Sequence, residues 1–213
     1  IYFCNKVAER INGDPEVNDR LRVVFVQNYN CSYAERIIPA ADLSQQISPA
    51  GTEASGTGNM KLMLNGAITL GTLDGANIEI AQQAGQENEY IFGATAQEID
   101  AIRETYNPND IYRASPRIRR AVDALVDGSI CEPDAGLTEL HDALLKGASW
   151  HRPDHHFLLL DFAAYQAARL RAYMEYKDEP RAFARKCLLN IAGAGPFSAD
   201  RAVRQYAENI WRV

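Results

Sequence analysis

Residues 53–73 read EASGTGNMKLMLNGAITLGTL and predict a turn, a helix and a strand in succession. Glycines at positions 56 and 58 indicate the turn, and the residues that follow as far as position 66 favour a helix. The run from Ile68 to Leu73 is short, apolar and bounded by turn residues, as a buried strand would be. A helix that leads into a buried strand is typical of an α/β fold.

Further strands and helices are predicted on either side of this stretch. The β-branched run 21–27 and the segment 90–92 each predict one more strand, and the first is expected to be buried in a parallel sheet. Helices are expected over residues 1–12, 33–37 and about 96–105. Because strands alternate with helices, we expect right-handed crossovers and a parallel sheet with helices on both faces.

From Pro116 onward the pattern is helical, so the sequence divides into an α/β part over 1–115 and a mainly helical part over 116–213. Ser198 is the predicted N-cap of the last helix. Three strands are few for a free-standing sheet of this kind. We therefore expect further strands upstream of Ile1, in a longer protein of which this chain is a piece. Helical spacing marks an apolar stripe on a long helix (Phe162, Tyr165, Leu170, Tyr173) and a buried face on the last one (Val203, Tyr206, Ile210, Trp211).

The composition is that of a soluble globular protein, with 213 residues of which 46% are hydrophobic and 23% charged. A net charge of −6 argues against a broad nucleic-acid surface, which needs clustered Lys and Arg. No run of about 18 apolar residues predicts a membrane-spanning helix. Four scattered cysteines without a Cys-x-x-Cys pair fit reduced thiols in a cytoplasmic protein.

Three histidines, His151, His155 and His156, raise the alternative of a metal site. The segment reads as a loop, and no cysteine lies close to it in sequence. We therefore expect an exposed polar loop there and no bound metal.

The turn at Ser55–Gly58 predicts an anion site, because backbone N–H groups at the start of a helix lack intrahelical partners. Gly56 and Gly58 allow close approach, and the Thr57 hydroxyl can add a donor. Lys61 follows among apolar neighbours, which disfavour the charged form of its amine. A phosphate site beside such an amine suits pyridoxal phosphate. A structural turn or an ordinary phosphate-binding turn stays open, although neither the P-loop nor the dinucleotide-binding order is present.

The window Glu53–Gly66, continued through residues 71–77, closely resembles the pyridoxal-phosphate segment of the α-glucan phosphorylases, which act on glycogen, starch or maltodextrin. The resemblance covers nearly the whole chain. It implies a partial Rossmann-like sheet of the GT-B glycosyltransferase type, followed by a helical C-terminal region. Other segments that resemble the family are Asp19–Val23, Gln27–Asn30, Ile38–Ser44, Asn190–Ala192, Phe197–Arg201 and Gln205–Trp211.

The resemblance implies that pyridoxal 5′-phosphate is held by a Schiff base to Lys61. Gly56, Thr57, Gly58 and Tyr29 match cofactor-binding positions. In this family the cofactor phosphate exchanges a proton with the substrate phosphate, which protonates the glycosidic oxygen. Lys61 is then an anchor rather than a base.

Substrate contacts are likewise implied, since Glu53, Ser55 and Gly56 match positions that bind the transferred glucose. The expected reaction moves the terminal α-1,4-linked glucosyl unit to orthophosphate and gives α-D-glucose 1-phosphate. Two of these assignments have plainer alternatives: Tyr29 could serve packing, and Glu53 could cap a turn.

The resemblance further implies partners and a whole protein. Complete family members have an N-terminal part that completes the active site, and they form homodimers, so we expect the isolated chain to be inactive. Two other functions stay open. One is a nucleotide-sugar glycosyltransferase of the GT-B type, a class that lacks the continuation of residues 60–66. The other is a non-enzymatic carbohydrate-binding module derived from a phosphorylase.

Overall fold

The computed structural model describes residues 1–17 and 19–213, which form two compact units. Unit 1 comprises Ile1–Asn30 and Tyr106–Leu159, and unit 2 comprises Cys31–Thr105 and Leu160–Val213. Each unit is thus assembled from two separate stretches of sequence. The boundary predicted at residue 115 separates strand-containing sequence from mainly helical sequence, and not one compact unit from another. It stays a prediction.

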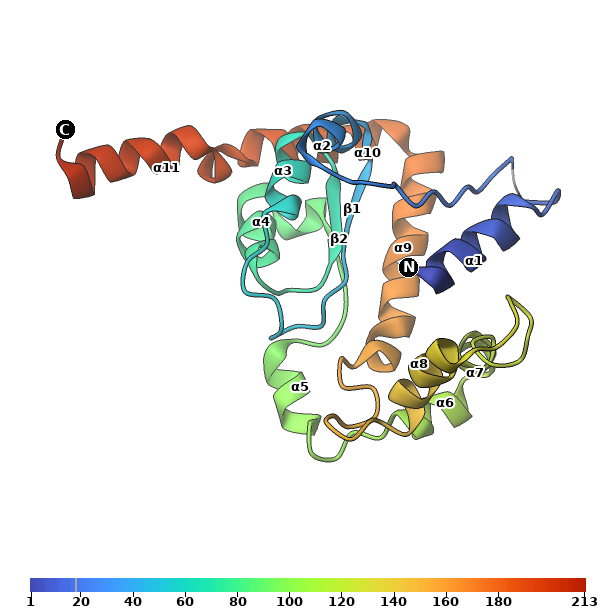
Figure 1. Cartoon of the computed structure of the whole chain (residues 1–213). Coiled ribbons are helices and arrows are strands. Elements are labelled where there is room, and N and C mark those ends of the chain that lie inside the picture. The colour runs from blue at the N-terminus through green and yellow to red at the C-terminus, as the bar shows by residue number, and fades with distance from the viewer. Residues whose placement is uncertain (18) are drawn as a thin grey trace. The chain divides into compact units, whose positions relative to one another are not determined.

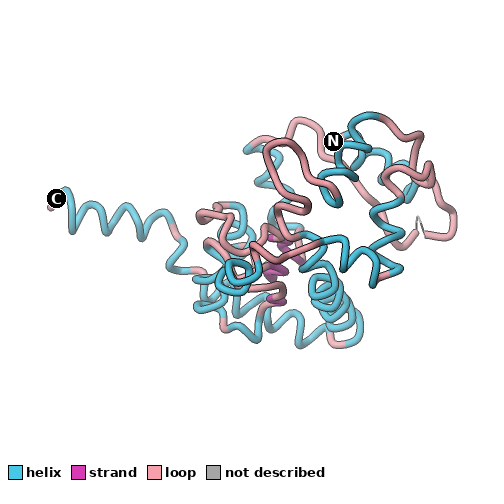
Figure 2. Tube along the Cα trace, turned by 90° about the horizontal axis from the view of Figure 1, so that it is seen from below, coloured by secondary structure: helices cyan, strands magenta, loops and turns pink. Residues whose placement is uncertain are grey.

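Unit 2 contains a parallel sheet of three strands in the order β1-β2-β3. The strands are β1 (Leu43–Gln46), β2 (Ile68–Gly71) and β3 (Tyr90–Ile91), and Figure 2 shows them side by side among helices. Helix α3 (Gly58–Leu64) connects β1 to β2, and α4 (Ala76–Ala84) connects β2 to β3. The prediction of an α/β fold with a parallel sheet is therefore confirmed, as are two of its three predicted strands.

The strand predicted over residues 21–27 is wrong. This segment has no strand structure and is largely exposed, with Val24 at 74%. Its backbone is held by a side chain instead: the Asn12 amide donates to Val23 O at 2.8 Å and accepts from Val23 N at 3.0 Å. The sheet contains β1 instead, a strand that was not predicted. Its sequence Leu-Ser-Gln-Gln carries no apolar run.

The core of unit 2 lies between the sheet and two helices, α9 (Leu158–Asp178) and α10 (Pro180–Gly193). Residues of β2 and β3 pack against small residues of α9, which let the helix approach closely. A second cluster joins α3, α4 and the end of α10. The first cluster comprises Ile68, Leu70, Tyr90, Phe92, Ala168, Ala172 and Phe183, and the second comprises Met63, Ile80, Ala84 and Ala194.

The remaining elements of unit 2 are short. Thr95 caps α5 by accepting from the Glu98 N–H, and Glu98 completes a capping box. These elements are α2 (Cys31–Ile37), η1 (Ile38–Ala40), η2 (Gln86–Asn88), α5 (Ala96–Ile102), η3 (Gly195–Phe197), α11 (Ala199–Tyr206) and η4 (Ala207–Trp211).

The apolar stripe predicted for α9 is only partly buried, and the face predicted for the last helix is exposed. In α9 the fully buried positions are Ala168 and Ala172, whereas Leu170 and Tyr173 are exposed. Figure 1 shows α11 and the turns after it extending away from the sheet of unit 2. Ser198 does precede α11, but its side chain makes no capping hydrogen bond. The predicted buried face is wrong for this chain, because all four of its residues are exposed: Val203, Tyr206, Ile210 and Trp211.

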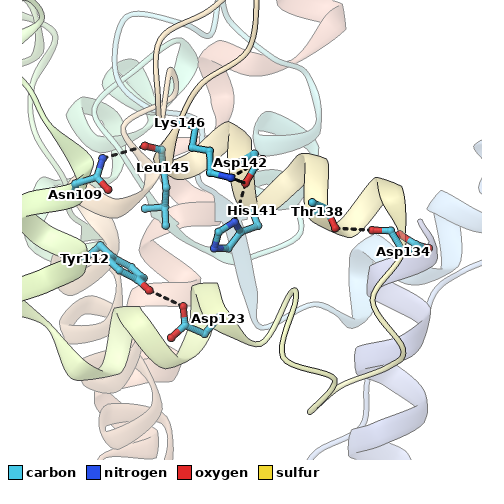
Figure 3. A network of polar contacts seen from close by, with 9 residues as sticks. All are labelled: Asn109, Tyr112, Asp123, Asp134, Thr138, His141, Asp142, Leu145 and Lys146. Carbon is cyan, nitrogen blue, oxygen red and sulfur yellow. Dashed lines mark hydrogen bonds and ion pairs between the residues drawn. The ribbon is translucent and has the colours of Figure 1, made fainter.

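Unit 1 is built from α1 (Tyr2–Asn12), α6 (Pro108–Ala114), α7 (Pro116–Asp123) and α8 (Ala135–Leu145). Polar contacts join α6 to α7 and to α8, as Figure 3 shows. The Tyr112 hydroxyl donates to Asp123 at 2.6 Å, and the Asn109 amide donates to Leu145 O at 2.9 Å. In the part of the chain that the structure describes, no helix has the length and apolar character to cross a bilayer.

Candidate functional site

The glycine-rich loop before α3 is held by the loop that follows β2. One carboxylate oxygen of the buried Asp74 accepts from the backbone N–H of Thr52 at 3.0 Å and of Glu53 at 2.7 Å. Hydrogen bonds from N–H groups to a carboxylate are among the stronger ones in proteins. Asp74 therefore fixes the start of the segment that carries the predicted site residues.

The two loops approach each other most closely at Ser55 and Gly75. The Ala76 N–H donates to Ser55 O at 2.9 Å. Gly75 has φ +49°, and a Cβ there would lie 2.8 Å from Ser55 O and 3.1 Å from Glu53 Cγ. A side chain at position 75 would thus push the predicted substrate-binding segment out of place, so this contact requires glycine.

A chain of buried amides links the starts of α3 and α4. The Asn59 amide donates to Asn77 Oδ1 at 3.0 Å, and the Asn77 amide donates to Thr72 O at 3.1 Å. The Thr72 hydroxyl in turn donates to Ser48 O at 2.6 Å. Because these groups are buried and paired, they set the position of α3 relative to the end of β2.

Gly56 and Gly58 differ in what their backbone requires. Gly56 has φ +84°, a left-handed conformation that favours glycine, and a Cβ there would lie 3.2 Å from Asn59 Oδ1. Around Gly58, the first residue of α3, a Cβ would meet nothing within 4 Å. The space beside the start of α3 is therefore open to a ligand, and the adjacent N–H groups precede the first intrahelical hydrogen bonds.

Lys61 is the fourth residue of α3, and its N–H donates to Thr57 O at 3.2 Å. Met63, on the same helix, is fully buried and anchors α3 in the core. The expectation that apolar neighbours remove the Lys61 amine from solvent is not met, because the residue is exposed. Of its apolar neighbours in sequence, Met63 alone is buried, whereas Met60 and Leu62 are half-buried and Leu64 is exposed.

The other predicted site residues fall into two groups. Glu53, Ser55 and Thr57 are exposed and lie on the loop that leads into α3, so unit 2 brings them together with Lys61. Tyr29 belongs to unit 1 and is 60% exposed. Its role at the cofactor stays a prediction from the resemblance.

A hollow of about 470 Å³ borders Ser55 of the loop and Met60 of α3. Its other walls come from α4 and from residues 196–202. Lys61 does not line it, so this hollow is not the space into which the lysine side chain opens.

The histidine-containing loop lies in unit 1. The His155 ring centroid is 5.9 Å from that of His151 and 5.2 Å from that of His156, and Trp150 packs edge-on against His151. Over residues 1–17 and 19–213, no group of three or more His, Cys, Asp and Glu side chains is arranged to hold a metal ion.

The described geometry defines a class: an α/β protein with a small parallel sheet, in which a glycine-rich loop precedes a short helix carrying an exposed lysine. The family model of the carbohydrate phosphorylases matches residues 1–213, and the chain belongs to that family.

Named relatives agree with this assignment. The chain is 45% identical to the brain form of glycogen phosphorylase from Bos taurus, over 99% of this chain and 24% of that protein. It is 43% identical to a glycogen phosphorylase of Synechocystis sp., over 100% of this chain and 24% of that protein, and 44% identical to one of Chlamydia trachomatis, over 100% and 26%. The chain thus spans about a quarter of the length of these relatives.

Sequence reasoning assigned no role to Asp74, Asn77 or Asn59, although these residues hold the predicted site together. A signal was present for two of them, because polar residues that follow a buried strand lie at its carboxyl end, where sites in parallel sheets form. Asn59 gave no such signal, since an asparagine at a helix start reads as an exposed turn residue.

Proposed function

We propose that this chain is the cofactor-bearing part of an α-glucan phosphorylase, an enzyme that transfers a terminal α-1,4-linked glucosyl unit to orthophosphate. The observation that carries the proposal is the loop before Lys61. Asp74, Gly75 and Asn77 hold it in one defined conformation, with open space at Gly58. Membership of the carbohydrate phosphorylases favours this activity over nucleotide-sugar transfer.

The residues present fit pyridoxal 5′-phosphate. N–H groups of Gly56, Thr57 and Gly58 can bind its phosphate, because they lie just before or at the first residue of α3. The exposed Lys61 amine can bond covalently to its aldehyde carbon. When bound, the cofactor supplies a phosphate group that exchanges protons with the phosphate of the substrate.

The sugar contacts are proposed for the loop itself. The Glu53 carboxylate can accept from two neighbouring hydroxyls of glucose, and the Ser55 hydroxyl can donate or accept beside it. Because the Glu53 N–H is bound to Asp74 and Ser55 O to Ala76 N, the backbone of both residues is fixed before any ligand arrives. This preorganisation lowers the entropic cost of binding.

The chain supplies only part of the proposed enzyme, since it spans about a quarter of its relatives. We propose that the rest of the longer protein completes the active site, that the sheet extends into a Rossmann-like domain of the GT-B type, and that the whole enzyme is a cytoplasmic homodimer. Tyr29 is proposed to contact the cofactor. The isolated 213-residue chain is then inactive in phosphorolysis.

The proposal is tested by reducing the chain with borohydride after incubation with pyridoxal phosphate and mapping the modified peptide by mass spectrometry. We expect one phosphopyridoxyl group, on Lys61. Lys61→Arg keeps the charge but cannot form the bond, and it should abolish the label. Lys177→Arg removes another exposed helical lysine and serves as the matched control, which should leave the label unchanged.

Equal labelling of many lysines would contradict a specific cofactor site. If the isolated chain stays unlabelled, the same reaction on the longer protein decides the matter: a label on Lys61 there means that the remaining part is needed to form the pocket. Production of glucose 1-phosphate by the isolated chain would show that the active site does not need that part.

A further inference from the structure

Glu89 is a buried carboxyl group outside the proposed site. It stands between η2 and β3, is 5% exposed, and accepts from the Thr69 N–H of β2 at 2.6 Å through Oε2. Its other oxygen, Oε1, has no hydrogen-bond partner among the described residues. Burying a carboxylate oxygen without a hydrogen-bond donor costs free energy, which disfavours the ionised form of Glu89.

Two further oxygens around Glu89 are also buried and without partners in the described structure. They are the Thr69 hydroxyl oxygen and Asn190 Oδ1, and both side chains lie close enough to interact with the carboxyl group of Glu89. The three come from β2, the segment before β3, and α10, so they converge from separate elements on one point in the interior.

The orientation of the Asn190 amide is fixed by its surroundings. Its nitrogen donates to Lys186 O at 3.1 Å and to Asn88 O at 3.4 Å, and a backbone carbonyl can only accept. Turning the amide over would set its oxygen against both carbonyls. Asn190 therefore offers Glu89 an acceptor and not a donor.

We propose that Glu89, Asn190 and Thr69 form a buried proton-binding site, in which Glu89 is a neutral carboxylic acid that donates from Oε1 to Asn190 Oδ1. Oε2 then accepts from the Thr69 N–H at 2.6 Å. This single proton thus gives a partner to Glu89 Oε1 and to Asn190 Oδ1, two of the three oxygens that otherwise lack one.

The charged groups nearby do not remove the need for this proton. Lys186 on α10 is the cation that acts on Glu89, but its amine is bonded to Glu175 of α9 at 2.7 Å, and Tyr90 of β3 donates to the same oxygen at 2.8 Å. The Cys187 thiol of α10 also faces this region and offers no positive charge. The charge of Lys186 is therefore already matched by a carboxylate.

Electrostatics agree with the geometry. Burial raises the pKa of Glu89 from 4.5 to about 7, against the opposing effects of the Thr69 N–H and the Lys186 charge. At Glu175 burial acts in the same upward direction, but the hydrogen bonds from Lys186 and Tyr90 outweigh it and hold the pKa below its ordinary value. The two carboxyl groups therefore differ in charge near neutral pH.

Infrared spectroscopy tests the proton directly. In the chain labelled with 13C at glutamate carboxyl groups, we expect the carbonyl band of a buried neutral carboxylic acid at pH 6, and its loss in Glu89→Gln. Glu98→Gln is the matched control, because Glu98 is exposed and should not contribute to that band. Absence of the band in the folded wild-type chain at pH 6 would overturn the proposal.

The Glu89→Gln variant also provides a test through stability. A glutamine amide can accept from the Thr69 N–H and donate to Asn190 Oδ1, as the neutral acid does, but it cannot ionise. We expect its denaturation midpoint to equal that of the wild type at pH 5 and to exceed it at pH 8. A variant that is less stable than the wild type at both pH values would show that Glu89 is ionised or bound to an internal water, and would overturn the proposal.

Discussion

Unit 2 buries polar side chains in two places beside β2, and the two clusters are organised in opposite ways. After the end of the strand, Asp74 and Asn77 meet backbone N–H and amide donors, and each has its partner. Beside Thr69, a carboxylate oxygen of Glu89 and the amide oxygen of Asn190 are both acceptors. Neither has a donor unless one proton is added to Glu89. The first cluster fixes a loop through paired donors and acceptors, whereas the second depends on the protonation of Glu89.

The largest expected effect comes from breaking the satisfied cluster. Asp74→Ala removes two charge-assisted hydrogen bonds and leaves the N–H groups of Thr52 and Glu53 without their acceptor. We expect unit 2 to lose about 3–5 kcal/mol of stability, and labelling of Lys61 by pyridoxal phosphate to fall. Hydrogen exchange at the β2 amides measures the first quantity, because they lie in the core of this unit.

Asp100→Ala provides the control for that prediction. Asp100 is exposed on α5 and pairs with Arg103 at 2.9 Å, so its removal should cost no more than about 1 kcal/mol. Equal effects of the two substitutions would mean that Asp74 does not fix the loop.

The second effect is the pH dependence of the unsatisfied cluster. The folded state binds the Glu89 proton more tightly than the unfolded state, so its stabilisation is complete below pH 4.5 and is lost as pH rises through about 7. The rise in pKa corresponds to about 3 kcal/mol. Urea denaturation from pH 5 to pH 8 should show this decrease for the wild-type chain and a flatter profile for Glu89→Gln. Identical profiles would assign the pH dependence to other groups.

A smaller loss of stability is expected from replacing Gly75, which lies against Ser55 in the cluster around Asp74. Gly75→Ala places a methyl group 2.8 Å from Ser55 O at a left-handed φ, and we expect it to cost about 1–3 kcal/mol. Gly58→Ala is the matched comparison, because its Cβ meets nothing within 4 Å. It should leave thermal stability within about 1 kcal/mol of the wild type while it weakens labelling of Lys61. Weaker labelling with Gly58→Ala at unchanged stability would separate ligand binding from folding.

The sequence predicts those parts of the fold that local pattern determines. The apolar runs of β2 and β3 and the glycine-rich turn before α3 are found where they were expected. β1 was missed because its polar sequence gains strand structure from pairing with β2 and not from its own hydrophobicity. The run at 21–27 has strand propensity but no pairing partner in the described structure, so propensity alone did not decide it.

The candidate site was predictable to a similar degree. The loop and its lysine carry a recognisable pattern, but the partners that hold the loop lie 18–24 positions away and depend on the register of the sheet. The proton at Glu89 was not predictable, because a glutamate beside a strand ordinarily reads as a solvated residue. Its burial follows from tertiary packing, in which α10 lies against both β2 and η2.

The smallest effect is expected at the C-terminal helix, which contrasts with both buried clusters. Ile210 and Trp211 are 65% and 59% exposed, so replacing either side chain by serine removes little packing within this chain. We expect the denaturation midpoint of Ile210→Ser to correspond to a change of at most about 0.5 kcal/mol. A loss of 2 kcal/mol or more, on the scale of about 2–5 kcal/mol for buried aliphatic side chains, would show that this face is covered in solution by another surface. Repeating the measurement over a tenfold range of protein concentration identifies that surface, because only contact between two copies of the chain makes the loss depend on concentration.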